Sequence, residues 1–522
     1  MSSIFNADFG SLSTQQVVIA AVTAIFGIWV LINVMQKKKR LPPGPRGLPV
    51  IGHLHMLAGS SHQNMMDLAK KYGHILYLKL GSHPAIFISS VELAKDVLKD
   101  QDQHFASRRL FITGKILAYD NQSTSLAQYG EKWRFMRKII SQELVSAKRI
   151  EQAQHIRVEE VANTLEEILN EGQDGKLVNF DMKLAQLVLN QTTRFNFSRS
   201  YYGKKRDTVE DNAEEFQGIV KLLGGTPFFL VGEFFPFLLA FDIGGVEKKM
   251  RAQGAKADEF YTKIVEGHRR DEAKNADKPK DFVDVMLAYQ KDPKNNINDG
   301  QIKAAIQDII VASSSTSSAS MLWILAELLK QPAVMRKLQQ ELDDVVGRDR
   351  LVEESDIANL PYLKCIVKEV FRLHPVLPLL VPHFNEEERT VGGYDIPAKT
   401  LVFVNVYAIG RDPTIWEDPL LFNPDRFIDS KMDVKGQNFE LLPFGSGRRM
   451  CVGYNLGLIT VEYGIAQLCH ALEISLPEGM SPKDIRMTES PGTSVTREDP
   501  LHVRVSPRLP SHVYAKAGIE LS

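Results

Sequence analysis

One ten-residue stretch, Phe444–Gly453, constrains this chain more than any other part of the sequence. It joins three glycines, two arginines and one cysteine, and it leads directly into an apolar segment with helical spacing, Leu456–Leu472. Glycine lets a backbone approach a bulky planar group and adopt φ values that other residues avoid. A cysteine at the start of a helix has N–H donors and the positive end of the helix dipole nearby, which favour the thiolate. The simpler alternative is a buried Cys451 beside a glycine-rich turn.

The full spacing of this stretch, Phe-x-x-Gly-x-Arg-x-Cys-x-Gly, resembles the haem-binding loop of the cytochrome P450 family. The resemblance implies that Cys451 is the axial thiolate ligand of the iron in haem b. Such a ligand pushes electron density toward the iron and favours O–O cleavage. It also implies that Arg449 pairs with a haem propionate and that the Phe444 ring packs near the sulfur.

Composition excludes several other classes of protein. The 522 residues are 44% hydrophobic and 24% charged, so the chain can bury a large core and is not disordered. A net charge of −1 gives no overall attraction to nucleic acid, and we expect no nucleic-acid partner. The three cysteines are Cys365, Cys451 and Cys469, with no Cys-x-x-Cys pair for zinc, which excludes a disulfide framework or a four-cysteine cluster.

The N-terminal region predicts a membrane anchor. Val17–Met35 contains no charged residue and, at 1.5 Å per residue, would span about 28 Å as a helix. The basic run 37–40 follows at once, which places that side in the cytoplasm and residues 1–16 in the lumen. A cleavable signal would carry its positive charge before the apolar stretch, so we expect an uncleaved single-pass anchor. A buried core helix is the alternative.

A basic, proline-rich hinge, 36–49, follows the anchor. Proline lacks an N–H and disfavours helix in the residue before it, so the hinge should be stiff and extended. In the family such a hinge follows the anchor of microsomal members, which lie on the endoplasmic reticulum and face the cytosol. The expected organisation is completed by a haem-thiolate catalytic domain, 50–510, and a tail, 511–522.

The expected fold is mainly α with a small β region, the cytochrome P450 fold. At the start of the domain, helical spacing and β-rich runs predict a helix over Asn64–Tyr72, a hairpin formed by strands Ile75–Leu80 and Ala85–Ser89, and a helix over Val91–Asp100. The segment Gln103–Leu126 is predicted to be irregular, and it matches the place where the family covers its substrate.

Further strands are expected near the second half of the domain. Val376–Pro382 is predicted to be strand-like and to face the pocket, while 391–397 and 401–406 should form the small β region. The segment 492–495 is another candidate for the tip of the pocket. From 150 to 290 the chain is predicted to be mostly amphipathic helix.

Two further elements match haem-contacting positions of the family. Trp133 and Arg137 lie four residues apart on one predicted helix face, which is ordinary packing by itself but resembles the family's second propionate clamp. His383 matches a position that contacts a propionate, with a surface histidine as the alternative. The phenylalanine-rich run 226–239 is predicted either to belong to the core or to line the substrate entrance and touch lipid.

The longest helix predicted by the sequence is Gln301–Lys330, which contains Ala-Ser-Ser-Ser-Thr at 312–316. The family usually has an acid followed by an alcohol here, and the pair is thought to pass protons to bound dioxygen. Thr316 matches the alcohol, whereas Ser315 replaces the acid and Ser313 the usual glycine. Because a serine hydroxyl has no useful acidity near pH 7, a relay through Ser315 must use water. Asp308 matches a position that faces the substrate or braces the covering loop.

An ionic scaffold is predicted behind the haem. Glu369 and Arg372 are three apart on a helix, and Arg426 belongs to a Pro-x-Arg-Phe element. Together they resemble the family's buried network that holds the cysteine loop. Loss of one member would leave an unpaired buried charge at a cost of roughly 3–5 kcal/mol.

The proline-rich hinge together with the motifs at 391–397, 404–413 and 439–451 resembles plant microsomal members of the family that act on specialised metabolites. The resemblance makes a monooxygenase of plant specialised metabolism the leading hypothesis. It would take O2, a small lipophilic substrate (a phenylpropanoid or flavonoid, a terpenoid or an alkaloid) and electrons from an NADPH-cytochrome P450 reductase in the same membrane. The second hypothesis keeps the haem but ends in coupling, rearrangement or dehydration, because of Ser315. The third is a haem-binding or electron-transfer protein without turnover.

Overall fold

The computed structural model describes residues 39–203, 245–272, 280–490 and 494–520, together with Thr23, Phe216, 218–220, 231–235, Asp242 and Gly492. Apart from Thr23, the predicted anchor lies outside the described residues, as do 226–230 and 236–239 of the phenylalanine-rich run.

The described part of the chain is mostly helical. Its α-helices are α2 (Ser61–Tyr72), α3 (Val91–Lys95), α4 (Asp102–Phe105), α5 (Ile112–Leu117), α6 (Glu131–Ile139), α7 (Ala147–Gln152), α8 (Gln154–Glu171), α9 (Phe180–Phe197), α11 (Val231–Phe234), α12 (Val246–Asp271), α13 (Phe282–Lys291), α14 (Asp299–Lys330), α15 (Pro332–Val346), α16 (Pro361–Leu373), α17 (Val406–Ile409), α18 (Tyr454–Ala471) and α19 (Ser511–Lys516). The prediction of a mainly helical chain with a small β region is confirmed.

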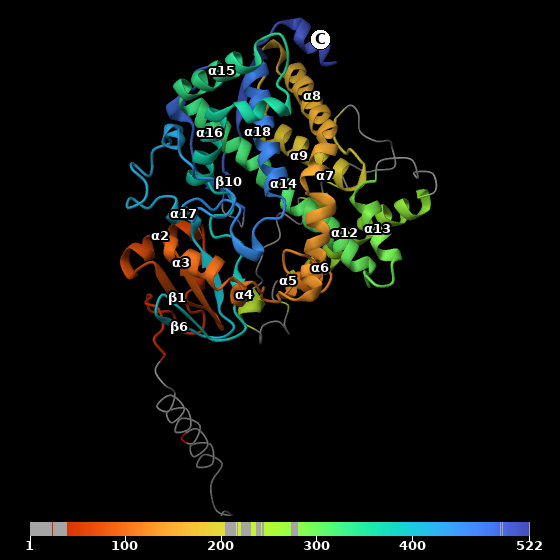
Figure 1. Ribbon diagram of the computed structural model, residues 1–522. Helices are drawn as coiled ribbons and strands as arrows, with labels where there is room; N and C mark the ends of the chain where they lie inside the picture. The colour runs from red at the N-terminus through yellow and green to blue at the C-terminus, as the bar shows by residue number, and fades with distance from the viewer. Residues whose placement is uncertain are drawn as a thin grey trace, which may run out of the picture.

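The strands are short and form several small sheets. They are β1 (Ile75–Leu80), β2 (His83–Ile88), β3 (Val178–Asn179), β4 (His383–Phe384), β5 (Arg389–Val391), β6 (Tyr394–Ile396), β7 (Leu401–Val404), β8 (Leu472–Ser475), β9 (Glu489–Ser490), β10 (Thr496–Arg497) and β11 (His502–Pro507). The largest sheet has the order β1-β2-β7-β4, with β2 and β7 parallel and the other pairs antiparallel. In Figure 1 strands β1 and β6 lie together with α2 and α3, apart from α8, α9 and α15.

Helix α14 passes through the centre of the helical part (Figure 1). A capping box between Asn298 and Gln301 fixes its start, because each side chain accepts a hydrogen bond from the other residue's backbone N–H. Among the described residues it is the one helix long and apolar enough to cross a membrane. Its second half is buried against α9, α16 and α18, so its hydrophobicity is that of a core helix.

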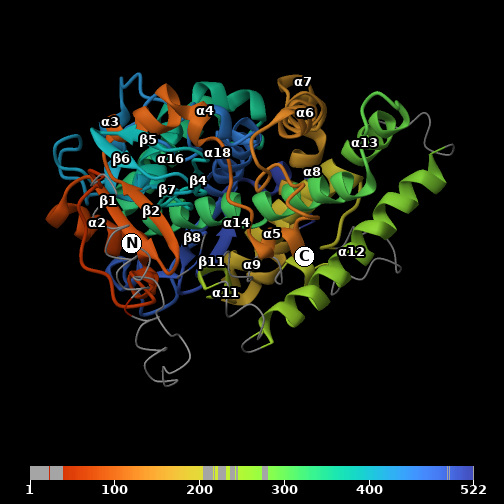
Figure 2. The same cartoon turned by 90° about the horizontal axis from the view of Figure 1, so that it is seen from below.

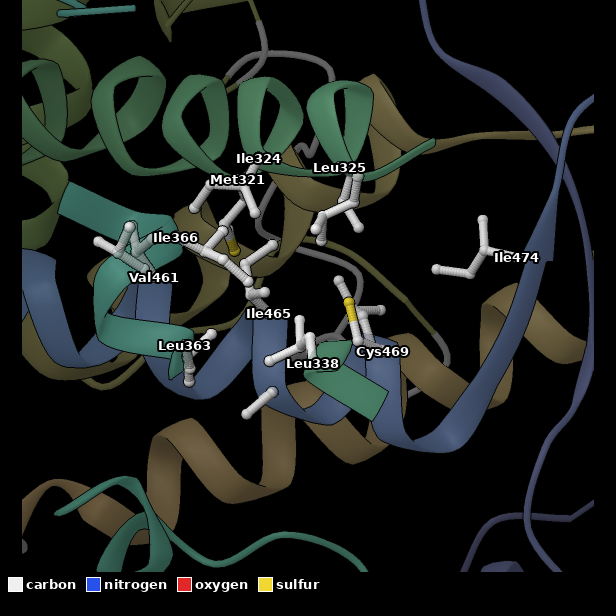
Figure 3. Close-up of a cluster of buried hydrophobic side chains, with 14 of the residues drawn as sticks. Met321, Ile324, Leu325, Leu338, Leu363, Ile366, Val461, Ile465, Cys469 and Ile474 are labelled. Atoms are coloured by element: carbon white, nitrogen blue, oxygen red, sulfur yellow. The ribbon is translucent and has the colours of Figure 1, made fainter. Parts of the chain in front are cut away.

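The core behind α14 is built from four helices. Figure 3 shows Met321, Ile324 and Leu325 of α14 facing Leu363 and Ile366 of α16, Leu338 of α15, and Val461, Ile465 and Cys469 of α18. Ile324, Leu338, Leu363, Ile366 and Ile465 are fully buried. Burying such a side chain contributes roughly 1.5–3 kcal/mol, so this cluster fixes α14 relative to α18, the helix that follows Cys451.

Some predicted boundaries are confirmed and others shift. β1 has the predicted bounds, but β2 begins at His83, so the turn shortens to Gly81-Ser82 and Pro84 lies inside the strand. Proline is tolerated there because the parallel ladder to β7 begins only at Ala85. α14 begins two residues before the predicted start, and α18 includes Tyr454.

Two predictions of local structure are wrong. Gln103–Leu126 is not wholly irregular, since it contains most of α4 and the whole of α5. Val376–Pro382 contains no strand: Leu380 N–H closes a turn onto the Leu377 carbonyl at 3.0 Å, and Leu380 adopts a φ of 52°. A left-handed leucine cannot continue a strand, so pairing is confined to the two residues of β4 that follow.

Candidate functional site

The Cys451 loop is a closed turn that leads into α18. The Cys451 N–H donates to the Phe444 carbonyl at 2.9 Å, and the Ser446 hydroxyl donates to the Gly436 carbonyl at 2.6 Å. Gly447 has a φ of 66°, and a Cβ there would lie 2.0 Å from the Leu98 carbonyl oxygen. No other residue fits this position, because both the backbone conformation and the contact exclude a side chain.

The Phe444 ring lies where three helices meet. It packs edge-on against Phe371 of α16 at a centroid distance of 5.5 Å. A Cβ on Gly457 of α18 would lie 3.8 Å from Phe444 Cε1 and 3.9 Å from Ser317 Oγ of α14. The start of α18, the cysteine loop and the middle of α14 therefore share one small region.

The Cys451 side chain is exposed, whereas Cys365 and Cys469 are buried. The pKa of the Cys451 thiol is nevertheless raised, because the surrounding protein desolvates it; the Gly453 backbone N–H and Arg137 act in the opposite direction. Cys451 can be both exposed and desolvated if its thiol faces a space that is enclosed by protein. The helix start alone therefore does not produce a thiolate, and coordination to a metal ion would be needed to deprotonate the sulfur.

Arg449 and Arg137 both lie over the indole ring of Trp133. The Arg449 guanidinium lies 4.3 Å and the Arg137 guanidinium 5.4 Å from the Trp133 ring centre. The Trp133 indole N–H donates to the Thr124 carbonyl at 2.9 Å, and Arg449 Nη1 donates to the same oxygen at 3.0 Å. Arg137 donates to the Met450 carbonyl beside Cys451. The sequence elements predicted to contact a propionate are thus brought together around Trp133.

Arg108 belongs to the same cluster and was not found by sequence reasoning. It is buried and donates to the carbonyls of Val381, Pro382 and Ser125. Burial lowers its pKa to about 9. Burial, Arg108 and Arg137 together lower the pKa of Arg449 to about 8.

The three guanidinium groups form no ion pair with a carboxylate among the residues that the structure describes. Depressed arginine pKa values mean that positive charge has accumulated in a desolvated place without compensation. An anionic group bound between Arg108, Arg137 and Arg449 would restore the balance. The two carboxylates of haem b have the required charge, so the residues present fit this group.

His383 is buried beside this cluster. Its Nδ1 lies 3.0 Å from the Phe105 carbonyl, to which it donates as Nδ1–H. Burial, Arg108 and Arg449 hold its pKa well below the usual value, despite the Phe105 hydrogen bond. The ring is therefore neutral, and Nε2 offers a lone pair, which suits a donor and not a bare carboxylate. The alternative of a surface histidine is wrong, since His383 is 7% exposed.

An accessible strip interrupts the buried course of α14. Val311 is 37% exposed, Ala312 is exposed and 313–316 are partly exposed, whereas Ile310 and Met321 are fully buried. Most hydroxyls of this strip are held by the helix itself: Ser313 donates to the Ile309 carbonyl, Ser314 to Val311 and Thr316 to Ala312, at 2.8–3.2 Å.

Ser315 differs from these neighbours. Its hydroxyl has no hydrogen-bond partner within the described part of the protein, and its side chain is partly accessible. Ser313 accepts a further hydrogen bond from Thr192 of α9 at 2.9 Å, so the serine that replaces glycine ties α14 to α9. Ser315 is therefore the hydroxyl of the Ser313–Thr316 run that remains available to water or a ligand.

Asp308, two turns before Ser315, braces the covering loop. Its carboxylate accepts hydrogen bonds from the backbone N–H and hydroxyl groups of Thr124 and Ser125, the shortest at 2.5 Å. Burial raises its pKa, and these four hydrogen bonds oppose the rise. The Thr124 carbonyl also accepts hydrogen bonds from Trp133 and Arg449, so Asp308 links α14 to the cationic cluster.

The ionic scaffold is fully formed. Glu369 and Arg372 are both 0% exposed and paired at 2.7 Å, and Arg426 Nε lies 3.0 Å from the other Glu369 oxygen. Arg372 also donates to the carbonyls of Gly410, Pro419 and Leu421. These contacts hold the segment 410–426 against α16, whose Phe371 supports Phe444.

Two surface hollows lie away from this site. One of about 460 Å³ lies between the ends of α8 and β11 and includes Gly172 and Arg504, and one of about 240 Å³ lies between α8 and α9 and includes Glu160 and Tyr202. Neither includes Cys451 or a residue of α14, so neither is the expected active site.

Comparison with known proteins finds relatives of this chain in sequence and in fold. The family model described as cytochrome P450 matches residues 42–505. Cytochrome P450 CYP736A12 of Panax ginseng is 39% identical over 482 residues, covering 90% of this chain and 94% of the relative. The flavonoid 3'-monooxygenase of Petunia hybrida is 38% identical over 483 residues, covering 91% and 93%. A solved zebrafish cytochrome P450 with abiraterone superposes with a TM-score of 0.72 at 25% identity, covering 86% of this chain and 99% of that one.

Proposed function

Because this chain belongs to the cytochrome P450 family of monooxygenases, we propose that it binds haem b through Cys451 and hydroxylates a small lipophilic plant metabolite. The observation that carries this proposal is the exposed but desolvated Cys451 thiol, set beside a buried cluster of uncompensated arginines. A thiolate ligand and two acidic groups on one planar molecule would satisfy both features at once.

Several residues would hold the cofactor. Cys451 would ligate the iron, Phe444 would pack near the sulfur, and Arg449, Arg137 and Arg108 would pair with the propionates, with Trp133 fixing the first two guanidinium planes. His383 would contact a propionate only as an Nε2–H donor, which requires the bound anion to raise its pKa. When bound, haem supplies the iron at which O2 is activated with electrons from NADPH.

The chain's own contribution on the opposite side would come from α14. Its accessible strip, 311–316, would face the substrate and the oxygen-binding side. The Thr316 hydroxyl is oriented by the hydrogen bond that it donates to the Ala312 carbonyl, so the lone pairs of its oxygen remain free to accept a hydrogen bond. Ser315 would hold a water molecule by its unengaged hydroxyl and thereby continue a hydroxyl–water path without a carboxylate.

The relatives and the accessible strip support a proposal for the substrate class. Proteins named flavonoid 3'-monooxygenase or flavonoid 3',5'-hydroxylase are 35–38% identical to this chain over most of its length. We favour a flavonoid or another phenylpropanoid over a terpenoid or an alkaloid, because a phenolic hydroxyl would find a partner in the Ser315 side chain.

The proposed location is the endoplasmic reticulum membrane, with one span at 17–35 and the catalytic domain in the cytosol. The supports are the apolar run followed by four basic residues and the plant relatives. The proposed electron donor is a membrane-bound NADPH-cytochrome P450 reductase, which such a location would bring within reach.

A second reaction, coupling, rearrangement or dehydration of the substrate, is favoured by one specific observation. The accessible strip contains no carboxylate, and Asp308, the nearest acid before it on α14, is occupied by Thr124 and Ser125. Such a strip would suit a reaction that does not depend on a carboxylate to deliver protons. A haem carrier without turnover is the third possibility, and the accessible strip argues against it.

Two measurements test the proposal. In Cys451→Ser, the reduced carbon monoxide complex should lose the shifted absorption typical of thiolate ligation, whereas the matched Cys365→Ser protein should keep it. Microsomes containing this chain and a reductase are then incubated with a flavonoid panel under labelled dioxygen. One labelled oxygen atom in the product supports hydroxylation, a product without label supports the second reaction, and no product with any substrate supports the carrier. If the carbon monoxide spectrum of Cys451→Ser is unchanged, Cys451 is not the iron ligand.

A further inference from the structure

A histidine and two aspartates meet on the side of the molecule opposite the sheet of β1 and β2. His268 lies in the last turn of α12, Asp281 caps the N-terminus of α13, and Asp284 lies in its first turn. Figure 2 shows α12 and α13 side by side at the edge of the molecule. One nitrogen or oxygen ligand atom from each residue lies within 4.8 Å of the others.

The imidazole is oriented as a metal ligand is. His268 Nδ1 donates to the Ile264 carbonyl at 2.8 Å, which leaves Nε2 to point at the carboxylates. A backbone carbonyl on the second nitrogen is the usual arrangement that fixes the tautomer of a metal-binding histidine. His268 Nε2 lies 3.0 Å from Asp281 Oδ2. The ligands of a tetrahedral Zn²⁺ ion with bonds of ~2.1 Å are ~3.4 Å apart, so a small opening of this contact would admit the ion.

The charge of the cluster is unbalanced. Neither Asp281 nor Asp284 forms an ion pair with a lysine or an arginine in the described ranges. The exposed Lys280 makes no such pair; burial raises the pKa of Asp284, and the charge of Lys280 only opposes this rise. His268 and Asp281 are mostly buried, with side chains 10% and 6% exposed. Burial lowers the pKa of His268, but the hydrogen bond and the charge of Asp281 outweigh it and raise the pKa above its usual value. Even with a protonated imidazole, the two carboxylates leave one negative charge in the cluster, and a divalent cation that displaced this proton would neutralise both.

We propose that His268, Asp281 and Asp284 form a binding site for a divalent transition-metal ion such as Zn²⁺, outside the haem site. Imidazole favours Zn²⁺ over Mg²⁺ or Ca²⁺, and the two carboxylates supply hard oxygen ligands, with water completing the shell. The ion would clamp the end of α12 to the start of α13. It would also reach the end of α9, because the Ser198 hydroxyl donates to Asp281 Oδ2 at 2.7 Å.

The competing arrangement is a simple ion pair between protonated His268 and Asp281, in which Asp284 has no role. The variant Asp284→Asn separates the two. It removes one metal ligand and leaves the His268–Asp281 contact intact, and its backbone bond to Asp281 is a weak one at 3.4 Å. The variant His268→Ala removes a ligand from both arrangements. The control His155→Ala changes a histidine that also faces a helical carbonyl, Gln152 at 3.0 Å, but belongs to no such cluster among the described residues.

The experiment is a calorimetric titration of the haem-containing full-length protein, purified without a polyhistidine tag, with Zn²⁺. We expect one saturable equivalent in the wild-type protein and in His155→Ala, and at least tenfold weaker binding in His268→Ala and Asp284→Asn. The carbon monoxide spectrum confirms that each variant is folded. Wild-type affinity in Asp284→Asn, or no saturable equivalent in the wild-type protein, overturns the site.

Discussion

Glu369→Gln is the sharpest test of the scaffold behind the cysteine loop. The Glu369 carboxylate accepts two bonds from Arg372 and one from Arg426, all at 2.7–3.0 Å, and a fourth from the Asn423 backbone N–H at 2.8 Å. Glutamine removes the negative charge and turns one acceptor into a donor that faces a guanidinium. Arg372, which is 0% exposed, then keeps a positive charge without a counterion.

The expected cost follows from that burial. Breaking a buried pair by removing one partner destabilises a protein by roughly 3–5 kcal/mol, because the remaining charge stays desolvated. Since about 1.4 kcal/mol is a factor of ten, the ratio of folded to unfolded protein should fall by between two and four powers of ten. Phe371 transmits the change to Phe444, so the fraction of protein with the thiolate-type carbon monoxide band should fall as well.

The assay is urea unfolding of the haem-containing protein, followed by that absorption band. The matched control is Glu259→Gln, which removes the same charge from an exposed pair with Lys263 and should cost no more than about 0.5 kcal/mol. If Glu369→Gln and Glu259→Gln unfold at the same urea concentration, the buried network does not support the loop and the reasoning is refuted.

Three other changes test separate parts of the structure. Ser315→Asp should restore an acid–alcohol pair with Thr316, and it should either raise the ratio of product to NADPH consumed or divert a rearranged product toward simple hydroxylation. If a folded variant changes neither the product nor this ratio, Ser315 lies outside the proton path. Glu462→Gln should stabilise the protein above pH 7 by up to roughly 3 kcal/mol and have no effect near pH 4.5, because burial raises the pKa of this carboxyl from 4.5 to about 7 and makes its ionisation unfavourable in the folded state. Unfolding at pH 4.5 and at pH 8 measures the difference, and equal effects at both pH values would contradict the prediction. Deleting residues 1–36 should release the protein from membranes washed with carbonate, and a truncated protein that still resists extraction would exclude a single anchor.

Local motifs made much of the site predictable. The cysteine loop, the ends of α14 and the Glu369–Arg372 pair depend on residues a few positions apart, where glycine conformations, caps and helix spacing decide the structure. Their spacing therefore carries the information. The same holds for the hairpin of β1 and β2, in which β2 begins two residues and ends one residue earlier than predicted.

Features that depend on contacts between distant parts of the chain could not be predicted from the sequence. Arg108 has no recognisable motif, and its partners, Val381 and Pro382, follow it by more than 270 residues. The apolar run 376–382 has the composition of a strand, but Leu380 turns the chain toward the cysteine loop and packs near Gly445. The tail 511–522 includes α19, whose Val513 and Tyr514 are buried in the body of the protein; nothing in its sequence marked it as packed.

The crowding of Arg108, Arg137 and Arg449 has a consequence for the life of the protein in the cell. A newly made chain must bring three like charges into a desolvated place, and each disfavours the approach of the next. A ligand that binds only the folded state and neutralises them adds its binding free energy to folding. We therefore expect cofactor supply to set how much of this chain escapes degradation, so that cells short of haem would contain little of the protein at unchanged transcript levels.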